Sequence, residues 1–158
     1  MNRPRIMAII CAALTVVFVL LVTHSDPVSG RTADEIAKQL TQSDIFDTSG
    51  LVLRSGGEFK KTFLLSAGDY DGVVYYSADS IMDVRELLVV RLKDNSQAEP
   101  LMEVLQKRIE DKQTLFKGYA PEEEALLNGY VLQSARGVVL FAVCQNSERV
   151  LAAFKEAL

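Results

Sequence analysis

The beginning of the chain is an unbroken apolar run, and it limits where the rest of the protein can fold. Residues 6–22 read IMAIICAALTVVFVLLV, carry no charge, and include eleven Leu, Ile, Val or Phe residues. Each of these eleven favours membrane insertion by roughly 0.3 to 0.6 kcal/mol. Seventeen helical residues span about 25 Å, near the lower limit for crossing a bilayer. The sequence therefore predicts one N-terminal transmembrane helix over residues 6–22.

The flanking charges predict the orientation of this helix. Arg3 and Arg5 precede the run, and the next basic residue is Arg31. Because basic residues stay on the cytoplasmic side, we expect a single-pass protein in the cell membrane with its N-terminus inside and its C-terminal domain outside. The predicted organisation is a membrane anchor over residues 1–25, a spacer over 26–31 and an extracytoplasmic domain over 32–158.

A cleaved signal peptide has the same basic start and apolar centre, so cleavage remains an alternative to an anchor. The residues that would precede the cut, Thr23, His24 and Ser25, lack the small A-x-A pattern. Lipidation is the third and least favoured alternative, because Cys11 lies inside the apolar run rather than after it. In all three cases the domain lies outside the membrane.

Composition excludes several classes of function for the domain. Removing Arg3 and Arg5 from the 17 basic residues leaves 15 against 21 acidic ones, a net charge of −6 that disfavours nucleic acid. The single histidine, His24, lies at the membrane end of the spacer, so a catalytic histidine relay or a histidine metal site is not expected. The second cysteine, Cys144, ends an apolar stretch and is expected to be a small buried side chain. The sequence predicts no catalytic residue, no cofactor and no metal site.

Hydrophobic periodicity predicts an α+β domain with an antiparallel sheet of about four strands and helices packed on it. The expected helices cover residues 33–41, 58–65, 96–117, 121–128 and a C-terminal stretch that begins at Asn146 or Ser147. The expected strands cover residues 73–77, 86–93, 130–134 and 138–145, the last two joined as a hairpin through Ala135, Arg136 and Gly137. The strand VVLFAVC is apolar on both faces and is expected inside the sheet.

The longest predicted helix carries the clearest apolar stripe. Its buried positions are expected to be Leu101, Leu105, Ile109 and Phe116, widened by Val104 and Leu115. Its start is ambiguous: Ser96 and Glu99 fit a capping box, whereas Pro100 favours a start nearer Glu99.

The end of this helix contains the candidate binding residues Arg108, Asp111 and Tyr119. Arg108 is expected to pair with Asp111 or Glu110 on the surface, and Tyr119 lies in a tight connection. One interpretation is a helix–turn–helix junction held by packing. The other is a recognition corner from which Arg108 and Tyr119 point outward.

The same segment resembles the uncharacterised family called domain of unknown function 4358, found in anchored proteins of mostly clostridial bacteria. The resemblance rests on the pattern R-x-E-D-x-x-x-x-F-x-x-Y-x-P over residues 108–121, on the strand ending V-x-L-K-D over 90–94, and on Gly137 before a strand that reaches Val143. It extends from about Ala33 to the C-terminus. The sequence departs at Val138, where relatives often carry an aromatic residue, and it lacks the lipoprotein signal of many members. The resemblance implies the location and limits of the domain but no chemistry.

Two functions remain open. The first is a non-catalytic, membrane-tethered module that binds a partner protein or a cell-envelope polymer. The alternative is an enzyme or accessory subunit of envelope-polymer modification that uses Asp and Glu as acid and base. Two carboxylates about 5 to 9.5 Å apart in a cleft would favour the enzyme, and an exposed apolar patch would favour the binding module.

Overall fold

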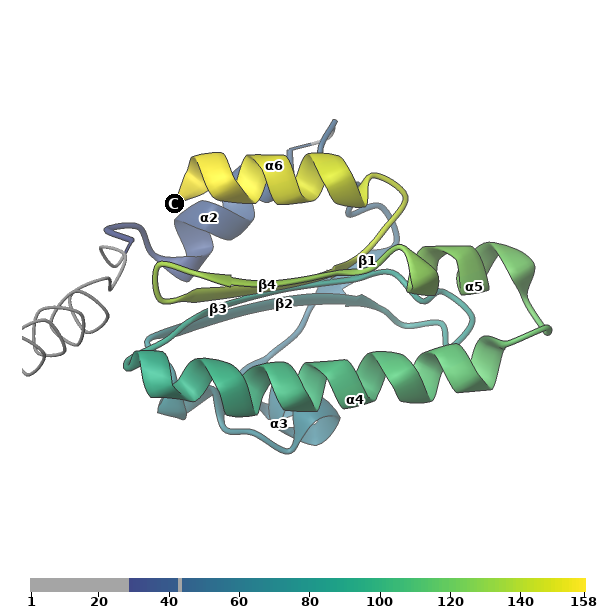
Figure 1. The fold of residues 1–158 in the computed structure, drawn as a ribbon, viewed down its shortest axis with the longest axis horizontal. Coiled ribbons are helices and arrows are strands. Elements are labelled where there is room, and N and C mark those ends of the chain that lie inside the picture. The colour runs from purple at the N-terminus through teal and green to yellow at the C-terminus, as the bar shows by residue number, and fades with distance from the viewer. Residues whose placement is uncertain (1–28, 43) are drawn as a thin grey trace, which may run out of the picture.

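A five-stranded antiparallel sheet lies between two layers of helices (Figure 1). The computed structural model describes residues 29–42 and 44–158. The elements in chain order are α2 (Ala33–Leu40), β1 (Leu51–Leu53), α3 (Gly56–Phe63), η1 (Ala67–Asp69), β2 (Gly72–Ala78), β3 (Glu86–Arg91), η2 (Asn95–Gln97), α4 (Ala98–Phe116), α5 (Pro121–Asn128), β4 (Val131–Ala135), β5 (Val138–Val143) and α6 (Ser147–Ala157). The strand order is β1-β2-β3-β5-β4. The predicted α+β class is confirmed, with five strands rather than four.

The strand missing from the sequence prediction is β1, at one edge of the sheet. It has only three residues and pairs with β2 through Leu51↔Ala78 and Leu53↔Tyr76. Its side chains are half-buried to exposed. Three residues are too few to show the alternation of apolar and polar side chains by which a strand is recognised in a sequence.

The interior strands β3 and β5 form the centre of the core, as their apolar sequences predict. All six residues of β5 are buried, and β3 is buried up to Val90 and only partly covered at Arg91. Side chains alternate between the faces of a strand. Leu87 and Val89 therefore pack on the side of α2 and α6, and Leu88 and Val90 belong to the core beneath α3 and α4.

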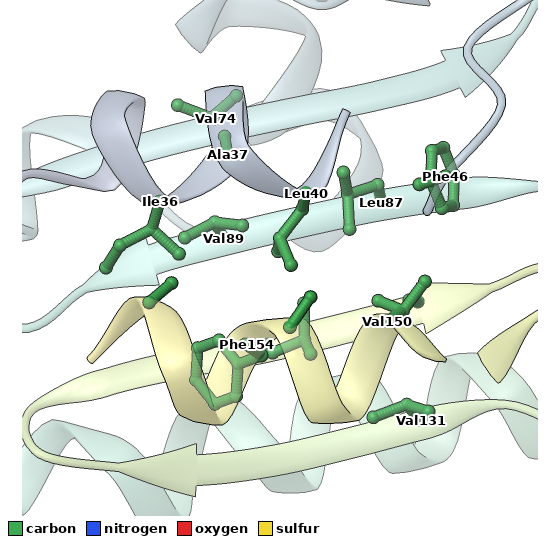
Figure 2. Packing of buried hydrophobic residues seen from close by; sticks show 14 of the residues in the cluster. Ile36, Ala37, Leu40, Phe46, Val74, Leu87, Val89, Val131, Val150 and Phe154 are labelled. Carbon is green, nitrogen blue, oxygen red and sulfur yellow. The ribbon is translucent and has the colours of Figure 1, made fainter. Parts of the chain in front are cut away.

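The layer formed by α2 and α6 packs on the sheet through a cluster of buried apolar side chains (Figure 2). Ile36 and Leu40 from α2 and Phe154 from α6 are fully buried there. The predicted start of α2 is confirmed: the Thr32 side chain and Glu35 form a reciprocal capping box. A Cβ atom at Gly72 would lie 3.0 Å from the Cβ of Ala33, so glycine lets α2 begin close to β2.

The opposite layer contains α3 and α4. The four predicted stripe residues of α4 are buried: Leu101, Leu105, Ile109 and Phe116. The Phe59 and Phe63 rings of α3, one turn apart as the sequence predicts, have centroids 5.0 Å apart.

Two expectations for α4 are wrong. Leu115 is exposed rather than part of the stripe, because α4 presents the Ile109 side to the sheet and Leu115 lies off that line. The capping box at Ser96 does not form, since the Asp94 side chain accepts from the Ser96 amide and pairs reciprocally with Gln97. The α4 helix then begins at Ala98, which places Pro100 in the first turn, where proline is tolerated.

The predicted hairpin between β4 and β5 is confirmed and turns through two residues. Arg136 and Gly137 both have positive φ, 48° and 75°. Two consecutive positive φ values are typical of the tight turns that match the twist of a hairpin.

Within residues 29–42 and 44–158, no helix is long and apolar enough to cross a membrane. The apolar run 6–22, its orientation, its cleavage alternative, Cys11 and His24 all lie outside the described residues.

Candidate functional site

Glu86, the first residue of β3, is fully buried. It lies on the same face of the strand as Leu88 and Val90 and so points toward α4. Ser77 on β2 and Val143 on β5 are its neighbours in register. An ionised carboxylate is stable in such a place only when it is paired and hydrogen-bonded.

Three side chains supply these partners. The Tyr75 hydroxyl donates to Glu86 Oε2 at 3.0 Å. Arg108 donates to the same oxygen from Nε at 3.3 Å and from Nη2 at 3.1 Å. Lys112 Nζ donates to the other oxygen, Oε1, at 2.8 Å. We call these four residues, Tyr75, Glu86, Arg108 and Lys112, the Glu86 cluster.

Opposing influences act on the Glu86 carboxyl. Burial raises its pKa, whereas the positive charges of Lys112 and Arg108 and their hydrogen bonds lower it. The cations outweigh burial, so the pKa lies below its ordinary value and the group is a carboxylate at neutral pH. This carboxylate is suited to holding two cations in place and unsuited to donating a proton.

The other members of the cluster are also held in one arrangement. Burial, and after it the negative charge of Glu86, raises the pKa of Tyr75 to about 12, so its hydroxyl stays protonated and donates. The Arg108 guanidinium lies 5.2 Å from the centroid of the Phe63 ring, a cation–π contact. The Phe63 ring in turn packs edge-on against Tyr75, with centroids 5.1 Å apart.

The cluster opens onto a hollow of about 290 Å³ at one end of the sheet. Its lining combines the C-terminal half of α4 with the end of β2 and the connection from β2 to β3: Ser77, Ala78, Asp79, Ser80, Ile81, Asp83, Arg85, Arg108, Lys112, Leu115 and Phe116. We call this space the α4 hollow.

A larger hollow of about 930 Å³ shares Ser80, Asp83 and Arg85 with the α4 hollow. It extends along α5 to the start of α6 and includes Cys144, which is buried as the sequence predicts. Burial raises the pKa of this thiol, which disfavours the reactive thiolate form.

The structure corrects the expected surroundings of Arg108. Its side chain does not pair on the surface with Asp111 or Glu110, because it belongs to the Glu86 cluster. Asp111 instead lies 3.8 Å from Lys107.

The two other candidate binding residues are exposed. The Asp111 carboxylate is well exposed in its pair with Lys107, and Tyr119 is 75 % exposed. The predicted corner therefore has an outward Tyr119 but an inward Arg108. Neither Asp111 nor Tyr119 lines the α4 hollow.

Sequence reasoning missed Glu86 and Lys112, although both carry a signal. Glu86 falls on the face of its strand that otherwise holds Leu88 and Val90. Arg108 follows Leu105 by three positions, and Lys112 precedes Phe116 by four, so both cations lie along the buried stripe of α4. An acid on an apolar strand face and two bases on an apolar helix stripe are what a buried ion cluster requires.

Among the described residues, no group of three or more His, Cys, Asp or Glu side chains is arranged to hold a metal ion. The arrangement at the end of the sheet offers fixed cations beside exposed apolar side chains rather than a ligand set.

Comparison with known proteins identifies a family. No curated protein and no solved structure matches the chain significantly. The sequence pattern of the family described as "Domain of unknown function (DUF4358)" matches residues 45–144. This span is shorter than the resemblance expected from the sequence, since it leaves out α2 and α6, but it contains the whole Glu86 cluster and the lining of the α4 hollow. The chain therefore belongs to the DUF4358 family.

Proposed function

We propose that this chain is a membrane-tethered, extracytoplasmic, non-catalytic module that binds a partner protein or a cell-envelope polymer at the α4 hollow. The observation that carries the proposal is the exposure of two apolar side chains at that hollow. Ile81 is 89 % exposed and Leu115 is 74 % exposed, and both line the same space as Arg108 and Lys112. Large apolar side chains gathered beside fixed charges are typical of surfaces that bind another molecule.

The charges of the Glu86 cluster support a role in binding rather than a role in packing. Replacing a buried ion cluster by apolar residues of similar volume is often neutral or stabilising. Stability alone therefore does not account for the Glu86 cluster, although its ion pairs do join α4 to β3. What it adds is two cations fixed at the edge of an open hollow.

The alternative, acid–base catalysis by Asp and Glu, receives less support. The Glu86 side chain has no exposed surface to offer a substrate. The two acids that line the α4 hollow are engaged by arginines: Asp79 lies 2.8 Å from Arg54, and Asp83 lies 2.6 Å from Arg85.

The tether rests on the apolar run 6–22 and on the two arginines before it. A reporter fused after Leu158 should be located outside the cell and remain in the membrane fraction. Recovery of a soluble mature chain beginning near Asp26 would show that residues 1–25 are a cleaved signal peptide and not an anchor.

The binding surface is tested by photocrosslinking in cells that naturally produce the protein. A photoreactive amino acid in place of Leu115 or Ile81 should give a discrete crosslinked product. The same amino acid in place of Lys155, which is exposed on α6 across the sheet, should give none. Equal crosslinking from all three positions, or crosslinking from none of them, would contradict the proposal.

A further inference from the structure

The strand β4 forms one edge of the sheet and lacks the features that usually protect an edge. It pairs with β5 on one side and is the last strand in the sheet order. Edge strands are commonly protected from further pairing by a charged residue, a proline, a bulge or a very short length. The sequence of β4 is VLQSA, and all five residues pair with β5 in unbroken register. This edge can therefore accept another strand.

The backbone groups that an added strand would use follow from the hydrogen bonds of β5. The Gly137 carbonyl accepts an amide from the β3 side of the sheet. Backbone groups alternate in direction along an antiparallel strand, so those of Val138 point the other way, toward Ala135 of β4. The same alternation along β4 directs the amides and carbonyls of Leu132 and Ser134 away from β5, to the outside of the sheet.

Three of these four outward groups have no hydrogen-bond partner among the described residues. They are the amide and carbonyl of Leu132 and the amide of Ser134. The fourth, the Ser134 carbonyl, accepts from the side-chain amide of Gln133 at 3.0 Å. An extended segment laid along β4 would satisfy the three open groups and replace the contact with Gln133.

A groove of about 690 Å³ lies between this edge and α4. Met102 and Leu132 are its larger apolar side chains, and both are half-buried. The Leu132 side chain packs on the α4 side of the sheet, while its backbone groups point outward. A residue paired opposite Leu132 would project its side chain to the same face of the sheet and so into the groove.

The rim of the groove has an excess of negative charge. Glu99, Glu103 and Glu110 line it, and within the described ranges none of the three forms an ion pair. The one basic residue in the lining, Lys107, lies 3.8 Å from Asp111. The connected charges are therefore four negative and one positive, a net charge of −3.

The hairpin turn beside the groove does not cancel this charge. Arg136 in the turn after β4 is exposed, and in the part of the chain that the structure describes it pairs with no acid. Counting Arg136 with the groove still leaves a net charge of −2. The groove thus combines an apolar floor, an acidic rim and an open strand edge.

We propose that β4 and this groove, which we call the β4 edge, bind an extended segment of a partner polypeptide that carries basic side chains on both sides of an apolar one. The segment pairs with β4 as a sixth, antiparallel strand. Its apolar side chain covers Met102, and Lys or Arg two positions before and after it meets the acids from Glu99 to Glu110. This inference goes beyond the proposed function, because it uses neither the α4 hollow nor the Glu86 cluster.

The spacing of the acids fits a strand with this pattern. Side chains on one face of a strand repeat about every 7 Å, so two bases four positions apart lie about 14 Å from each other. Eleven helical residues separate Glu99 from Glu110, which is about 16 Å along the axis of α4. The two bases can therefore reach opposite ends of the acidic rim while the residue between them lies over the apolar floor.

Two other occupants fit the charges less well. A second copy of the chain that paired through its own β4 would continue the sheet and place two acidic rims side by side. Residues 23–28, which precede Ser29 in the same chain, read THSDPV. They contain one acid, no Lys or Arg, and a proline that has no amide to donate to the edge.

The test titrates the full chain in nonionic detergent micelles with a fluorescent blocked peptide, Thr-Lys-Thr-Leu-Thr-Lys-Thr. Analogues with Gln or Glu in place of both Lys residues, and one N-methylated at Leu and at the central Thr residues, are titrated in parallel. The Lys peptide should bind at least about tenfold more tightly than the Glu peptide, with the Gln peptide between them. The difference should disappear in 1 M salt, where charges are screened within about 3 Å. The N-methylated peptide should not bind, because it keeps the side chains but cannot pair with a strand.

Amide hydrogen exchange on the unmodified chain shows whether the peptide pairs with β4. The amides of Leu132 and Ser134 should exchange more slowly when the Lys peptide is bound, since each gains or adjoins a new backbone bond. The amide of Gln133 points toward β5 and should change little. This pattern is specific to strand pairing and does not depend on any substitution.

Matched variants locate the site. Ser134→Pro removes an outward amide, which an edge strand tolerates, and should weaken the Lys peptide at least about tenfold, whereas Ser134→Thr should not. Glu103→Gln should reduce the preference for Lys over Gln about threefold. Glu148→Gln makes the same change on the exposed side of α6 and should alter nothing.

Equal affinity for the Lys and Glu peptides, equal affinity for the N-methylated peptide, or no binding at all would overturn the inference. Slow exchange of Leu132 and Ser134 in the free chain, rising with protein concentration together with dimer formation, would assign the edge to a second copy. Slow exchange at every concentration would mean that the chain covers its own edge. Both results would refute a basic partner. Crosslinking from Leu115 and Ile81 tests the proposed function separately, because neither residue lines the groove.

Discussion

The two faces of the sheet are each covered by two helices, but they bury different kinds of side chain. The face under α2 and α6 buries apolar groups such as Ile36 and Phe154 (Figures 1 and 2). The face under α3 and α4 buries Ile109 and also the charged Glu86. Apart from Glu86, the only buried polar residue in the described ranges is Ser29. One face is therefore a plain core, whereas the other combines a core with a fixed charge cluster.

The difference indicates that the α2 and α6 layer serves stability alone, whereas the α3 and α4 layer also holds charged groups at a surface. Apolar packing is non-directional and fills space, so the α2 and α6 layer can stabilise the sheet without fixing any group for a ligand. An ion cluster requires defined distances, and the pairs of Glu86 with Arg108 and Lys112 fix α4 relative to β3. The family match includes the layer with the cluster and leaves out α2 and α6.

Both faces of the sheet should contribute similarly to the free energy of unfolding through their apolar cores. Phe154→Ala should lower the free energy of unfolding by about 3 to 5 kcal/mol, and Ile109→Ala by about 2 to 5 kcal/mol, because each leaves a cavity among fully buried neighbours. Urea unfolding of the purified chain measures both. Leu115→Ala on the exposed side of α4 is the control and should stay within about 0.5 kcal/mol of wild type. A neutral Phe154→Ala or Ile109→Ala would show that the corresponding layer is not part of the core.

The second prediction concerns the face with the cluster alone. Arg108→Ala should cost about 1.5 to 3 kcal/mol, the usual range for hydrogen bonds to a charged group. The cost stays below the 3 to 5 kcal/mol of a buried charge left fully unpaired, because Lys112 still holds Glu86. Lys107→Ala breaks an exposed pair on the same helix and should cost about 0 to 1 kcal/mol.

The same unfolding measurements decide between the two environments of Arg108. The sequence predicts an exposed pair for Arg108, with a cost in the range expected for Lys107→Ala. Equal effects of the two substitutions would mean that Arg108 forms an exposed surface pair in solution and is not a member of the Glu86 cluster.

Most of the fold could be predicted from the sequence, because the spacing of apolar residues in a long helix or strand shows which side chains are buried. Apolar residues at helical spacing predict the buried stripe of α4. Continuous apolar runs predict that β3 and β5 are covered on both faces. The hairpin was accessible because Gly137 stands between two apolar runs. The edge strand β1 was missed because three residues are too few to show a period. For α4, the start near Glu99 that Pro100 favours agrees with the observed start at Ala98, and only the capping box at Ser96 was wrong, because Asp94 takes the capping position.

The site was much less accessible, since it depends on contacts between distant positions. Glu86 and Arg108 are 22 residues apart, and nothing local connects them. Arg108 has a nearby acid at Asp111, which made a surface pair the simpler interpretation. Only the register of α4 over β3, which is a tertiary fact, places the arginine over Glu86 instead. The exposure of Leu115 depends on the same register.

The final prediction is the smallest, a displaced titration of one carboxyl, and it tests whether cations or burial dominate at Glu86. Because Lys112 and Arg108 outweigh burial and lower its pKa, Glu86 should titrate below the ordinary glutamate value of about 4.3. A lowered pKa in the folded state means that ionised Glu86 stabilises the fold. This stabilisation is fully present above about pH 4.3, where the unfolded chain is also ionised, and it is lost as the pH falls through the folded pKa. Carboxyl ¹³C NMR of glutamate-labelled chain measures it, and the signal missing from Glu86→Gln gives the assignment. Arg108→Ala should move the titration upward, since one of the two stabilising cations is gone. A wild-type midpoint above 4.3 would mean that burial dominates, and Glu86 would then join the candidates for acid–base chemistry.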